Sequence, residues 1–583
     1  MVNNIIEKVD VLISGAGPTG LYFALRMAAM GHTFKIVEAR ESATTETRAL
    51  GVHPRTLETL QHRKLVNTML KRAFVVQGTR IMLKGELVAE MSMEGDTVYP
   101  YLTCIPQSET ENGFIDELGY ENITWHTQLV SYKQEKEGVE ALIKDLHTGK
   151  EEVVHARYII GADGTHSAVR KLDPTWTYEG YSVGTKFAVG DVYLSGKDIE
   201  NLDPFRANIF LHSDGIVGGI PLGTDDQNKH LYRVFGNLGP YEVTHEKKST
   251  HGINHDSTLT LEELQKLINI RAAPLEIKIT EPQDLGIFHI NERKANGFRR
   301  NSAFVIGDAA HCHSPAGGQG MNLGLQDADN LSWKLSMVLN GSSSDPEKLL
   351  DSYNLEREPI DAATMKATGV ASKYMFGSGV ILCKFILPYV LSFPRITKPI
   401  YSSLMQLNTR IPKNSPILFQ STTTTVSATG LIEPGEFLRE TIPLRKRLIK
   451  DDIEHITLHH LLQNPLSQYT IMWISSRASR YPASDLTKDF WIKFNNTFGT
   501  TTSVVKSLII ESAHHTRKHK LPNYVTYQDY YENSFWLEDH CDEPKSVSNR
   551  VGLDKVIENN KDGVPPAAIV ILRPDLYVAY SGL

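Results

Sequence analysis

The chain has 583 residues, of which 41% are hydrophobic and 22% charged, as in ordinary soluble globular proteins. This length exceeds what one core can organise and predicts about three or four domains. The formal net charge of −7 gives no support for nucleic-acid binding, so we expect no nucleic-acid partner. The four cysteines contain no Cys-x-x-Cys pair, which argues against a disulfide scaffold and fits a reducing compartment.

Targeting signals are not apparent in the sequence. The N-terminus lacks the charged-then-apolar layout of a signal peptide, so we expect a cytoplasmic protein. The most apolar later segment, Val380 to Phe393, is interrupted by Lys384 and Pro388 and is shorter than the ~20 residues that span a bilayer. We interpret it as a buried or interface helix and expect no integral membrane segment.

The first elements form a dinucleotide-binding pattern. Residues 9–14 predict a buried strand, which runs into the glycine-rich turn 15–20 and then into a helix that stops at Gly31. A second strand, residues 34–37, ends at Glu38. Strand, glycine turn, helix, strand and acid in this order predict a bound nucleotide.

Each residue of this pattern has its own physical reason. Gly15 permits the tight turn, Gly17 lets the backbone approach a pyrophosphate, and Gly20 allows close packing of helix on strand. Glu38 lies where a carboxylate accepts hydrogen bonds from both hydroxyls of an adenosine ribose. An acid here disfavours a 2′-phosphate, so the nucleotide is expected to be FAD or NAD rather than NADP.

The segment from Arg48 to Glu58 has two interpretations that can both hold. Pro54 near a first turn, followed by Leu57 and Leu60, predicts the start of a helix that faces a core. Alternatively, Arg48 points toward the pyrophosphate as a cationic clamp.

The next segments alternate between strands and a helix. Short strand-like pieces run from about Val75 to Pro100, and a helix is expected to open near Pro106 with Gln107 free to bind a ligand. A strand near residues 153–162 leads into Asp163-Gly164, a second carboxylate–glycine turn at a strand end.

Residues 181–285 indicate a different module. Several strand-like runs and one helix, Leu261 to Ile268, predict a mixed antiparallel sheet inserted between the nucleotide-binding segments. A short strand, Ile287 to Ile290, is then expected to return to the first domain.

The stretch from Gly307 to Asn322 has the strongest local pattern. A strand over residues 303–306 precedes it, and apolar residues at helical spacing follow it as far as Gly341. Strand, glycine-rich turn and helix aim backbone N–H groups and a positive helix end at one point, which suits an anionic or carbonyl-bearing ligand. Asp308 is placed to accept hydrogen bonds from ligand hydroxyls.

The same stretch contains His311-Cys312-His313, which invites a metal interpretation. Adjacent residues on a turn rarely converge on one ion, and structural zinc sites use spaced ligands. We therefore expect no metal.

Three motifs are taken in their order along the chain: Gly15–Gly20 with Glu38, then Asp163-Gly164, then Gly307-Asp308. They resemble those of the group A flavoprotein monooxygenases. These are aromatic hydroxylases of the para-hydroxybenzoate hydroxylase fold, and the likeness covers about residues 7 to 375. The segment from about Gly430 onward resembles the thioredoxin-like C-terminal domain of phenol hydroxylase and the polyketide hydroxylases, with Ile569 to Asp575 as its most typical piece. Without a Cys-x-x-Cys pair, that domain is expected to be structural rather than redox-active.

The resemblance implies an α/β architecture in three parts. A Rossmann-like FAD-binding domain is expected from residues 1–75, 101–180 and 286–400, with an inserted substrate-binding sheet from residues 76–100 and 181–285. A linker, residues 401–429, is expected to lead to the thioredoxin-like domain, residues 430–583.

The resemblance also implies roles for individual residues. Arg48 and Gln107 match positions near the flavin phosphates and ribityl chain, and Asp163-Gly164 matches a turn that serves FAD and, transiently, NADPH. Met321 and Asn322 are expected to offer backbone N–H groups to the flavin N1–C2 edge. The complete FAD site that we expect comprises Gly15, Gly17, Pro18, Thr19, Gly20, Glu38, Ala39, Arg48, Gln107, Asp163, Gly307, Asp308, Gly318, Gly320, Met321 and Asn322.

The implied reaction is reduction of FAD by NADPH or NADH, addition of molecular oxygen to give a flavin C4a-hydroperoxide, and oxygen transfer to a phenolic or polyketide-type ring. Pro315 matches the position whose carbonyl faces substrate, and His212, Tyr232 and Arg233 are the candidates on the substrate sheet. A strand residue can face either side of its sheet, so these three stay open. Phenol hydroxylases have an Asp where this chain has Leu50, which disfavours phenol itself and favours bulkier phenolics and polyketides.

Competing functions are distinguished by sequence or by a simple assay. A flavin halogenase is disfavoured because none of the six tryptophans lies in a Trp-x-Trp-x-Ile-Pro motif. Epoxidation, Baeyer–Villiger oxidation and ring opening on the same fold remain alternatives, as does a flavin-binding scaffold without turnover. The expected partner is a small aromatic substrate, and a homodimer is left open.

Overall fold

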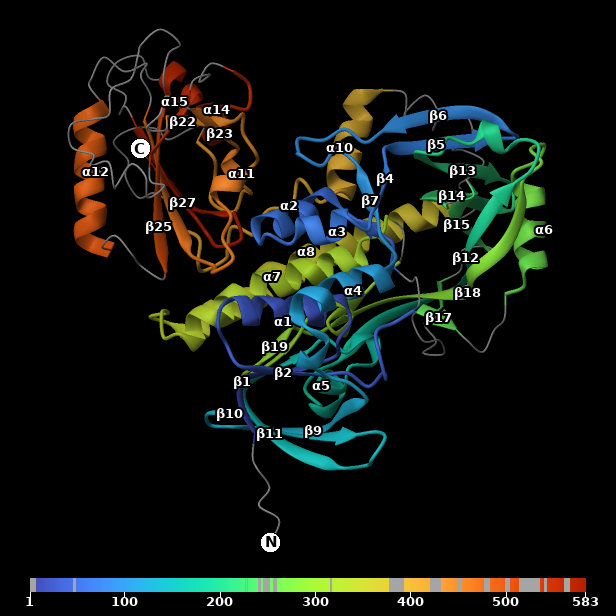
Figure 1. Ribbon diagram of the computed structural model, residues 1–583, viewed down its shortest axis with the longest axis horizontal. Helices are drawn as coiled ribbons and strands as arrows, with labels where there is room; N and C mark the ends of the chain where they lie inside the picture. Colours follow the sequence, from blue (N-terminus) through green and yellow to red (C-terminus); the bar gives the residue numbers. More distant parts are fainter. Residues whose placement is uncertain are drawn as a thin grey trace. The chain divides into compact units, whose positions relative to one another are not determined.

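The chain divides into two compact units (Figure 1). The first contains residues 1–58, 66–332 and 357–408, and the second contains residues 59–65, 333–356 and 409–583. The computed structural model describes residues 7–45, 49–225, 227, 229–239, 243–244, 252–254, 259–314, 317–376, 393–419, 431–447, 453–475, 483–498, 504–512, 535–538, 543–559 and 567–582.

An eight-stranded sheet forms the nucleotide-binding part of the first unit. Its main path is β19-β20-β11-β1-β2-β8, and β1 pairs in parallel with β2 and β11. The inner residues of β1, Val11 to Ser14, are all buried, as expected for a parallel strand covered on both faces. The strands are β1 (Glu7–Ser14), β2 (Phe34–Val37), β8 (Ile123–Thr124), β9 (Thr127–Glu135), β10 (Gly138–Asp145), β11 (Glu151–Gly161), β19 (Arg299–Arg300) and β20 (Ala303–Val305).

Helix α1 follows β1 directly, and helix α7 begins downstream of β20. The predicted strand–turn–helix segments at both places are confirmed, since α1 ends at Ala29 and α7 at Leu339, shortly before Gly31 and Gly341. Helix α1 also contacts α4, with the rings of Tyr22 and Phe114 5.6 Å apart (Figure 1). The helices with residues in this unit are α1 (Pro18–Ala29), α2 (Pro54–His62), α3 (Val66–Leu70), α4 (Gln107–Leu118), α5 (Ala168–Leu172), α6 (Leu261–Arg271), α7 (Gly320–Leu339), α8 (Pro346–Phe376) and α10 (Pro394–Leu404).

A ten-stranded, largely antiparallel sheet is the second layer of this unit. Its path is β17-β18-β12-β15-β14-β13-β5-β6, and α6 packs against one face. The mixed sheet and the helix beginning at Leu261 are therefore as predicted. The strands are β5 (Gly78–Leu83), β6 (Glu86–Ser92), β12 (Tyr178–Ser195), β13 (Arg206–His212), β14 (Gly215–Thr224), β15 (His230–Asn237), β16 (Val243–Thr244), β17 (Gly252–Asn254), β18 (Lys278–Ala295) and β21 (His311–Cys312).

One strand differs from the sequence prediction. Ile287 to Ile290 was expected to return to the nucleotide-binding domain, but these residues lie inside the long strand β18 of the ten-stranded sheet. The reason is that β18 continues to pair antiparallel with β12 from Lys278 as far as Ala295.

A small three-stranded sheet completes the first unit. Strand β7 (Leu102–Cys104) pairs with both β3 (Gly51–Val52) and β4 (Phe74–Val76). Gly51, from the segment between Arg48 and Glu58, lies opposite Cys104.

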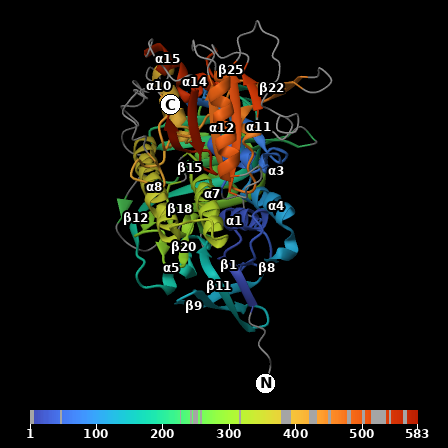
Figure 2. The ribbon, with the colours of Figure 1, turned by 90° about the vertical axis from the view of Figure 1, so that its left-hand side faces the viewer.

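The second unit is built on a seven-stranded sheet of order β23-β22-β26-β25-β24-β27-β28. Strands β24 and β25 are parallel, and the connecting helix α12 packs against both. Figures 1 and 2 show α12 and β25 in this unit. The thioredoxin-like assignment of this unit stays a prediction. Its elements are β22 (Leu444–Arg447), β23 (Ile453–Ile456), α11 (Leu458–Leu461), β24 (Tyr469–Ser475), α12 (Ala483–Phe498), β25 (Val505–Ser512), β26 (Phe535–Glu538), α14 (Val547–Val551), α15 (Leu553–Asn559), β27 (Ala567–Leu572) and β28 (Val578–Gly582).

Within the described part of the chain, no helix combines the length and the apolar character needed to cross a membrane. The apolar segment from Val380 lies outside the described residues as far as residue 392, and Phe393 at its end is exposed.

Candidate active site

The β1–α1 turn has two glycines that the backbone requires and one that faces open space. Gly15 has a φ of +103°, and a Cβ there would lie 2.5 Å from the carbonyl oxygen of Ala162. A Cβ on Gly20 would lie 2.0 Å from the carbonyl oxygen of Gly15. In contrast, a Cβ on Gly17 would meet no atom within 4 Å. The structure therefore leaves room for a ligand at Gly17.

Glu38 is held at the end of β2 by the turn that it was expected to serve. One carboxylate oxygen accepts the Ala16 N–H at 2.7 Å, and the other accepts the Arg40 N–H at 3.0 Å. The Arg40 guanidinium lies 3.1 Å from the same carboxylate. Glu38 is buried, whereas Ala39 is exposed. These contacts orient the carboxylate before any ligand binds.

Thr19 brings the first glycine turn next to the later Gly-Asp turn. A Cβ on Gly307 would lie 2.9 Å from the Thr19 hydroxyl oxygen, and a Cβ on Gly324 of α7 would lie 2.4 Å from it. Both glycines thus make room for Thr19. Pro18, at the first position of α1, is compatible with the helix start because the missing N–H has no partner there in any helix.

The Asp163-Gly164 turn lies at the end of β11, beside the β1–α1 turn. One Asp163 carboxylate oxygen accepts the Ser14 hydroxyl at 3.0 Å and the Ala168 N–H at 2.8 Å. The other oxygen is buried and has no hydrogen-bond partner within the described ranges. Burial raises the pKa of Asp163. Gly164 has a φ of +72° and open space where a Cβ would lie.

Arg170 of α5 links this turn to the Gly307-Asp308 turn. Its guanidinium donates to the carbonyl of Thr165 at 2.6 Å and also to the carbonyl of Ala309. Asp308 lies in the 3₁₀ turn Gly307–Ala309, and its side chain is exposed. The two carboxylate–glycine turns and the first glycine turn therefore meet in one place.

The start of α7 is fixed by the side chain of Asn322, a contact that sequence reasoning missed. The Asn322 amide oxygen accepts the His53 N–H at 2.8 Å, and its NH₂ donates to the carbonyls of Gly51 and Gly318 at 2.8 and 2.7 Å. Gly318 has a φ of +63°. Strand β3 is thereby tied to the glycine-rich turn and to Gly320 and Met321 at the first turn of α7.

Two buried histidines flank the same turn. His53 had no role in the sequence-based prediction, and His313 was considered there only as a metal ligand. Burial lowers the pKa of His53 and of His313 to about 4 each, so both are neutral at physiological pH. A Cβ on Gly318 would lie 3.7 Å from His53, and one on Gly320 would lie 3.8 Å from His313. The only sequence signal was their proximity to the glycine-rich segments.

The side-chain amide of Gln107 was predicted to be free to bind a ligand, but it is hydrogen-bonded within the protein. Its carbonyl accepts the Ala49 N–H at 3.3 Å, and its NH₂ donates to Glu111 at 3.0 Å. Arg48 and Pro315 lie outside the described residues.

The three candidates on the substrate sheet lie in different surroundings. His212 is at the β13–β14 hairpin, where its ring accepts the Asp214 N–H at 3.2 Å. Tyr232 is buried in the cluster that packs against α6. Arg233 is buried in an ion pair with Asp191. The structure thus does not bring the three together, and a catalytic role for each stays a prediction.

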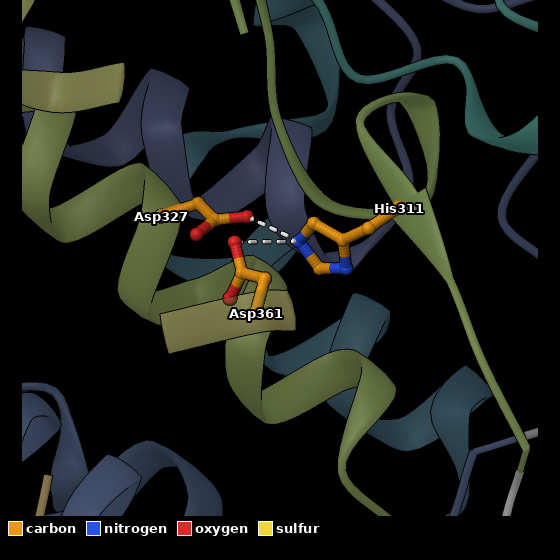
Figure 3. A group of neighbouring side chains, drawn as sticks. All are labelled: His311, Asp327 and Asp361. Carbon is orange, nitrogen blue, oxygen red and sulfur yellow. Dashed lines mark hydrogen bonds and ion pairs between the residues drawn. The ribbon is translucent and has the colours of Figure 1, made fainter. Parts of the chain in front are cut away.

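A buried charge cluster lies behind the Gly307 turn, and sequence reasoning did not identify it. Asp327 of α7 and Asp361 of α8 point to one nitrogen of His311, at 2.8 and 3.4 Å (Figure 3). Arg357 donates to Asp327 at 2.6 Å and to Asp361 at 3.1 Å. Asp327 also accepts the Gly307 N–H at 3.1 Å, so the cluster holds the turn that carries Asp308.

The charges of this cluster favour an ionic network over a metal site. His311, Asp327 and Asp361 are close enough to hold an ion. However, although burial alone lowers the pKa of His311, the carboxylates of Asp361 and Asp327 outweigh burial and raise that pKa to about 9. A protonated imidazole is not a metal ligand. Arg357 adds a second positive charge beside the two carboxylates, and burial together with the neighbouring Asp327 raises the pKa of Asp361 to about 7.

The network predicts a pH dependence of stability. The pKa of His311 rises from 6.5 in the unfolded chain to about 9 in the folded protein. Its contribution to the stability of the folded state is therefore fully present below pH 6.5 and is lost as the pH rises toward 9. Relative to His311→Asn, wild type should therefore lose about 2 kcal/mol between pH 7 and pH 9. Denaturant titrations of both proteins at several pH values measure this difference, and parallel curves would contradict it.

Comparison with known proteins agrees with this geometry. A family model described as an FAD binding domain matches residues 8–368. An uncharacterised aromatic compound monooxygenase, YhjG of Bacillus subtilis (strain 168), is 31% identical over 412 residues, which cover 69% of this chain and 76% of that protein. Rifampicin monooxygenase of Rhodococcus hoagii is 30% identical over 366 residues, which cover 62% of this chain and 70% of that protein. The solved structure of OxyS anhydrotetracycline hydroxylase from Streptomyces rimosus has a similar fold, with a TM-score of 0.67 at 20% identity over 99% of this chain and 96% of that one.

The chain therefore belongs to the FAD binding domain family, whose model covers more than half of its residues. Within that family it is an FAD-dependent monooxygenase of the group A aromatic type, as the three motifs predicted. The residues described here fit FAD, since Gly17 and Gly164 leave open space, and Asp163 keeps a buried oxygen with no partner among them.

Asp308 provides a direct test of the FAD site. We expect Asp308→Ala to fold normally, because the side chain is exposed, but to purify with little flavin, because hydrogen bonds to ligand hydroxyls are lost. The ratio of flavin to protein absorbance measures the outcome. Asp116→Ala, which removes an exposed carboxylate that pairs with Arg72, serves as a control for general effects of carboxylate removal. Full flavin retention by Asp308→Ala would remove Asp308 from the site.

Proposed function

We propose that the protein hydroxylates a phenolic or polyketide-type aromatic substrate, with NADPH or NADH as electron donor and molecular oxygen as oxidant. In this proposal, the chemistry that bound FAD supplies is acceptance of electrons from the nicotinamide and transfer of oxygen to the aromatic ring through the C4a-hydroperoxide. The protein's part is to hold the flavin, to place the ring beside it and to keep water away.

The observation that carries the proposal is an apolar cluster joined to the start of α7. Leu50, Val76 and Cys104 are buried together, and Ile220 and Leu222 of the substrate sheet pack against them. Gly51, next to Leu50, accepts a hydrogen bond from Asn322 at the first turn of α7. In this proposal, an aromatic ring that binds beside this cluster contacts an apolar surface and lies close to the glycine-rich turn.

Similar proteins support an aromatic substrate. YhjG is named an aromatic compound monooxygenase, and the rifampicin monooxygenase is named for its substrate. Leu50, which replaces the Asp of phenol hydroxylases, adds to the apolar character of the cluster and favours a ring larger than phenol.

The decisive experiment is NADPH and NADH oxidation by the purified flavoprotein, with and without a panel of phenols and polyketide-like aromatics. Under ¹⁸O₂, the true substrate should both speed oxidation and gain one labelled oxygen by mass spectrometry. Faster oxidation with only peroxide would mark a ligand that triggers reduction without being hydroxylated. Failure of nicotinamide to reduce the flavin under any condition would contradict the proposal and favour a non-catalytic scaffold.

A further inference from the structure

A buried ion pair lies on the sheet that is proposed to bind substrate. Arg233 of β15 donates two hydrogen bonds to the carboxylate of Asp191 on β12, at 2.7 and 2.8 Å. The residues are only 5% and 3% exposed. This is the two-pronged geometry in which arginine binds a carboxylate most strongly.

Strand register places this pair on the same face of the sheet as the apolar cluster. Arg233 lies directly opposite Asp191 on one side and Ile220 on the other. Residues directly opposite each other in antiparallel strands share a face. Ile220 packs against the cluster of Leu50, Val76 and Cys104, whereas Tyr232, the neighbour of Arg233, packs on the α6 side.

Cys104 links the apolar cluster to the start of α7. Burial raises the pKa of the Cys104 thiol to about 12, and the positive charge of Arg233 acts against that rise. Cys104 also lies opposite Gly51, whose carbonyl accepts the Asn322 amide. Strand pairing and packing thus connect Arg233 through Ile220 and the cluster to the first turn of α7, all within the first unit.

We propose that Asp191 occupies the carboxylate-binding fork of Arg233 and thereby selects neutral phenolic substrates over aromatic acids. This inference rests on the proposed function and specifies its substrate class. An aromatic acid that bound the Arg233 guanidinium would leave the Asp191 carboxylate buried without its partner, and an unpaired buried charge costs free energy. Asp284, opposite Asp191 on β18, adds a further acidic group that disfavours an anion. A neutral ring disturbs neither charge.

The test compares two ligands of nearly the same shape that differ by one charge, salicylate and salicylamide. Their dissociation constants for the FAD-loaded protein are measured from changes in the flavin absorbance spectrum. Wild type should favour salicylamide. Asp191→Asn should shift the ratio of the two constants toward salicylate by about tenfold or more, because a charge-assisted bond to Arg233 becomes available.

Two further variants complete the experiment. Glu281→Gln removes a carboxylate from the exposed pair that Glu281 makes with Lys229 on the same sheet, and it should leave the ratio unchanged. In the double variant Asp191→Leu/Arg233→Met, both charges are absent, so the preference for salicylamide should remain. This variant also keeps the proposal testable if Asp191→Asn does not fold.

The outcomes separate this inference from the proposed function. An unchanged ratio of the two dissociation constants in folded, FAD-loaded Asp191→Asn would overturn the role of Asp191. A salicylate affinity lower in the double variant than in wild type would also overturn it, because Arg233 would then already bind the carboxylate in wild type. If wild type binds neither ligand and no aromatic compound speeds nicotinamide oxidation, the proposed function fails instead.

Discussion

Gly17→Val is expected to give a folded protein that purifies almost without FAD. In the structure a Cβ at Gly17 meets no protein atom within 4 Å, so the substitution causes no clash in the protein itself. The open space is where the family places the pyrophosphate, and a valine side chain would fill it. We expect the affinity for FAD to fall by about a hundredfold or more, which corresponds to at least ~3 kcal/mol.

The experiment separates ligand exclusion from misfolding. FAD titration of the apoprotein gives the affinity, and thermal unfolding of the same apoprotein should match that of wild type within about 2 °C. Gly20→Ala is the matched contrast, because its Cβ would lie 2.0 Å from the Gly15 carbonyl oxygen and should destabilise the fold itself. Normal FAD affinity in Gly17→Val would contradict the site.

These two glycines show what sequence can and cannot predict. The order of strand, glycine turn and helix is encoded within a few residues, so β1–α1 and β20–α7 were predicted correctly from local pattern. The motif also predicts which glycine faces a ligand, and the open space at Gly17 is compatible with that prediction. The contact of Thr19 with Gly307 does not, because it joins residues that are far apart in the chain.

The substrate sheet marks the limit of sequence reasoning more clearly. Arg233 and Tyr232 looked equivalent as candidates, since a strand residue can face either way. Neighbouring strand residues face opposite sides, but only the packing shows that Tyr232 takes the α6 side. Only the register of β15 with β12 and β14 pairs Arg233 with Asp191 and Ile220. Register depends on long-range pairing, which no local pattern reveals.

The composition of the second unit could not be predicted either. The resemblance suggested a separate C-terminal domain from about residue 430, yet the second unit also contains residues 59–65 and 333–356. It therefore includes the last turns of α7 and the first turns of α8. A buried charge network explains why these helical segments belong there.

That network is centred on Glu356 of α8. Its carboxylate accepts two hydrogen bonds from Arg573, at 2.7 and 2.9 Å, and one from Lys334 at 2.8 Å. Arg573 also donates to Asp575 at 2.6 Å. Glu356, Lys334 and Arg573 are completely buried. Burial alone would raise the pKa of Glu356, but Arg573 and Lys334 outweigh it and hold that pKa well below the ordinary value.

Glu356→Leu is therefore expected to destabilise the second unit by about 3–5 kcal/mol, because two buried cations would then share one carboxylate. Chemical denaturation followed by tryptophan fluorescence reports on this unit, which contains Trp333, Trp473, Trp491 and Trp536 of the six tryptophans. Glu433→Gln, which removes only the exposed pairs with Lys413 and Arg410, should cost less than about 1 kcal/mol. The destabilisation should shrink as the pH falls below 4.5, because the contribution of a carboxyl with a lowered pKa is lost on acidification. A loss below about 1 kcal/mol at neutral pH would show that this network does not stabilise the unit.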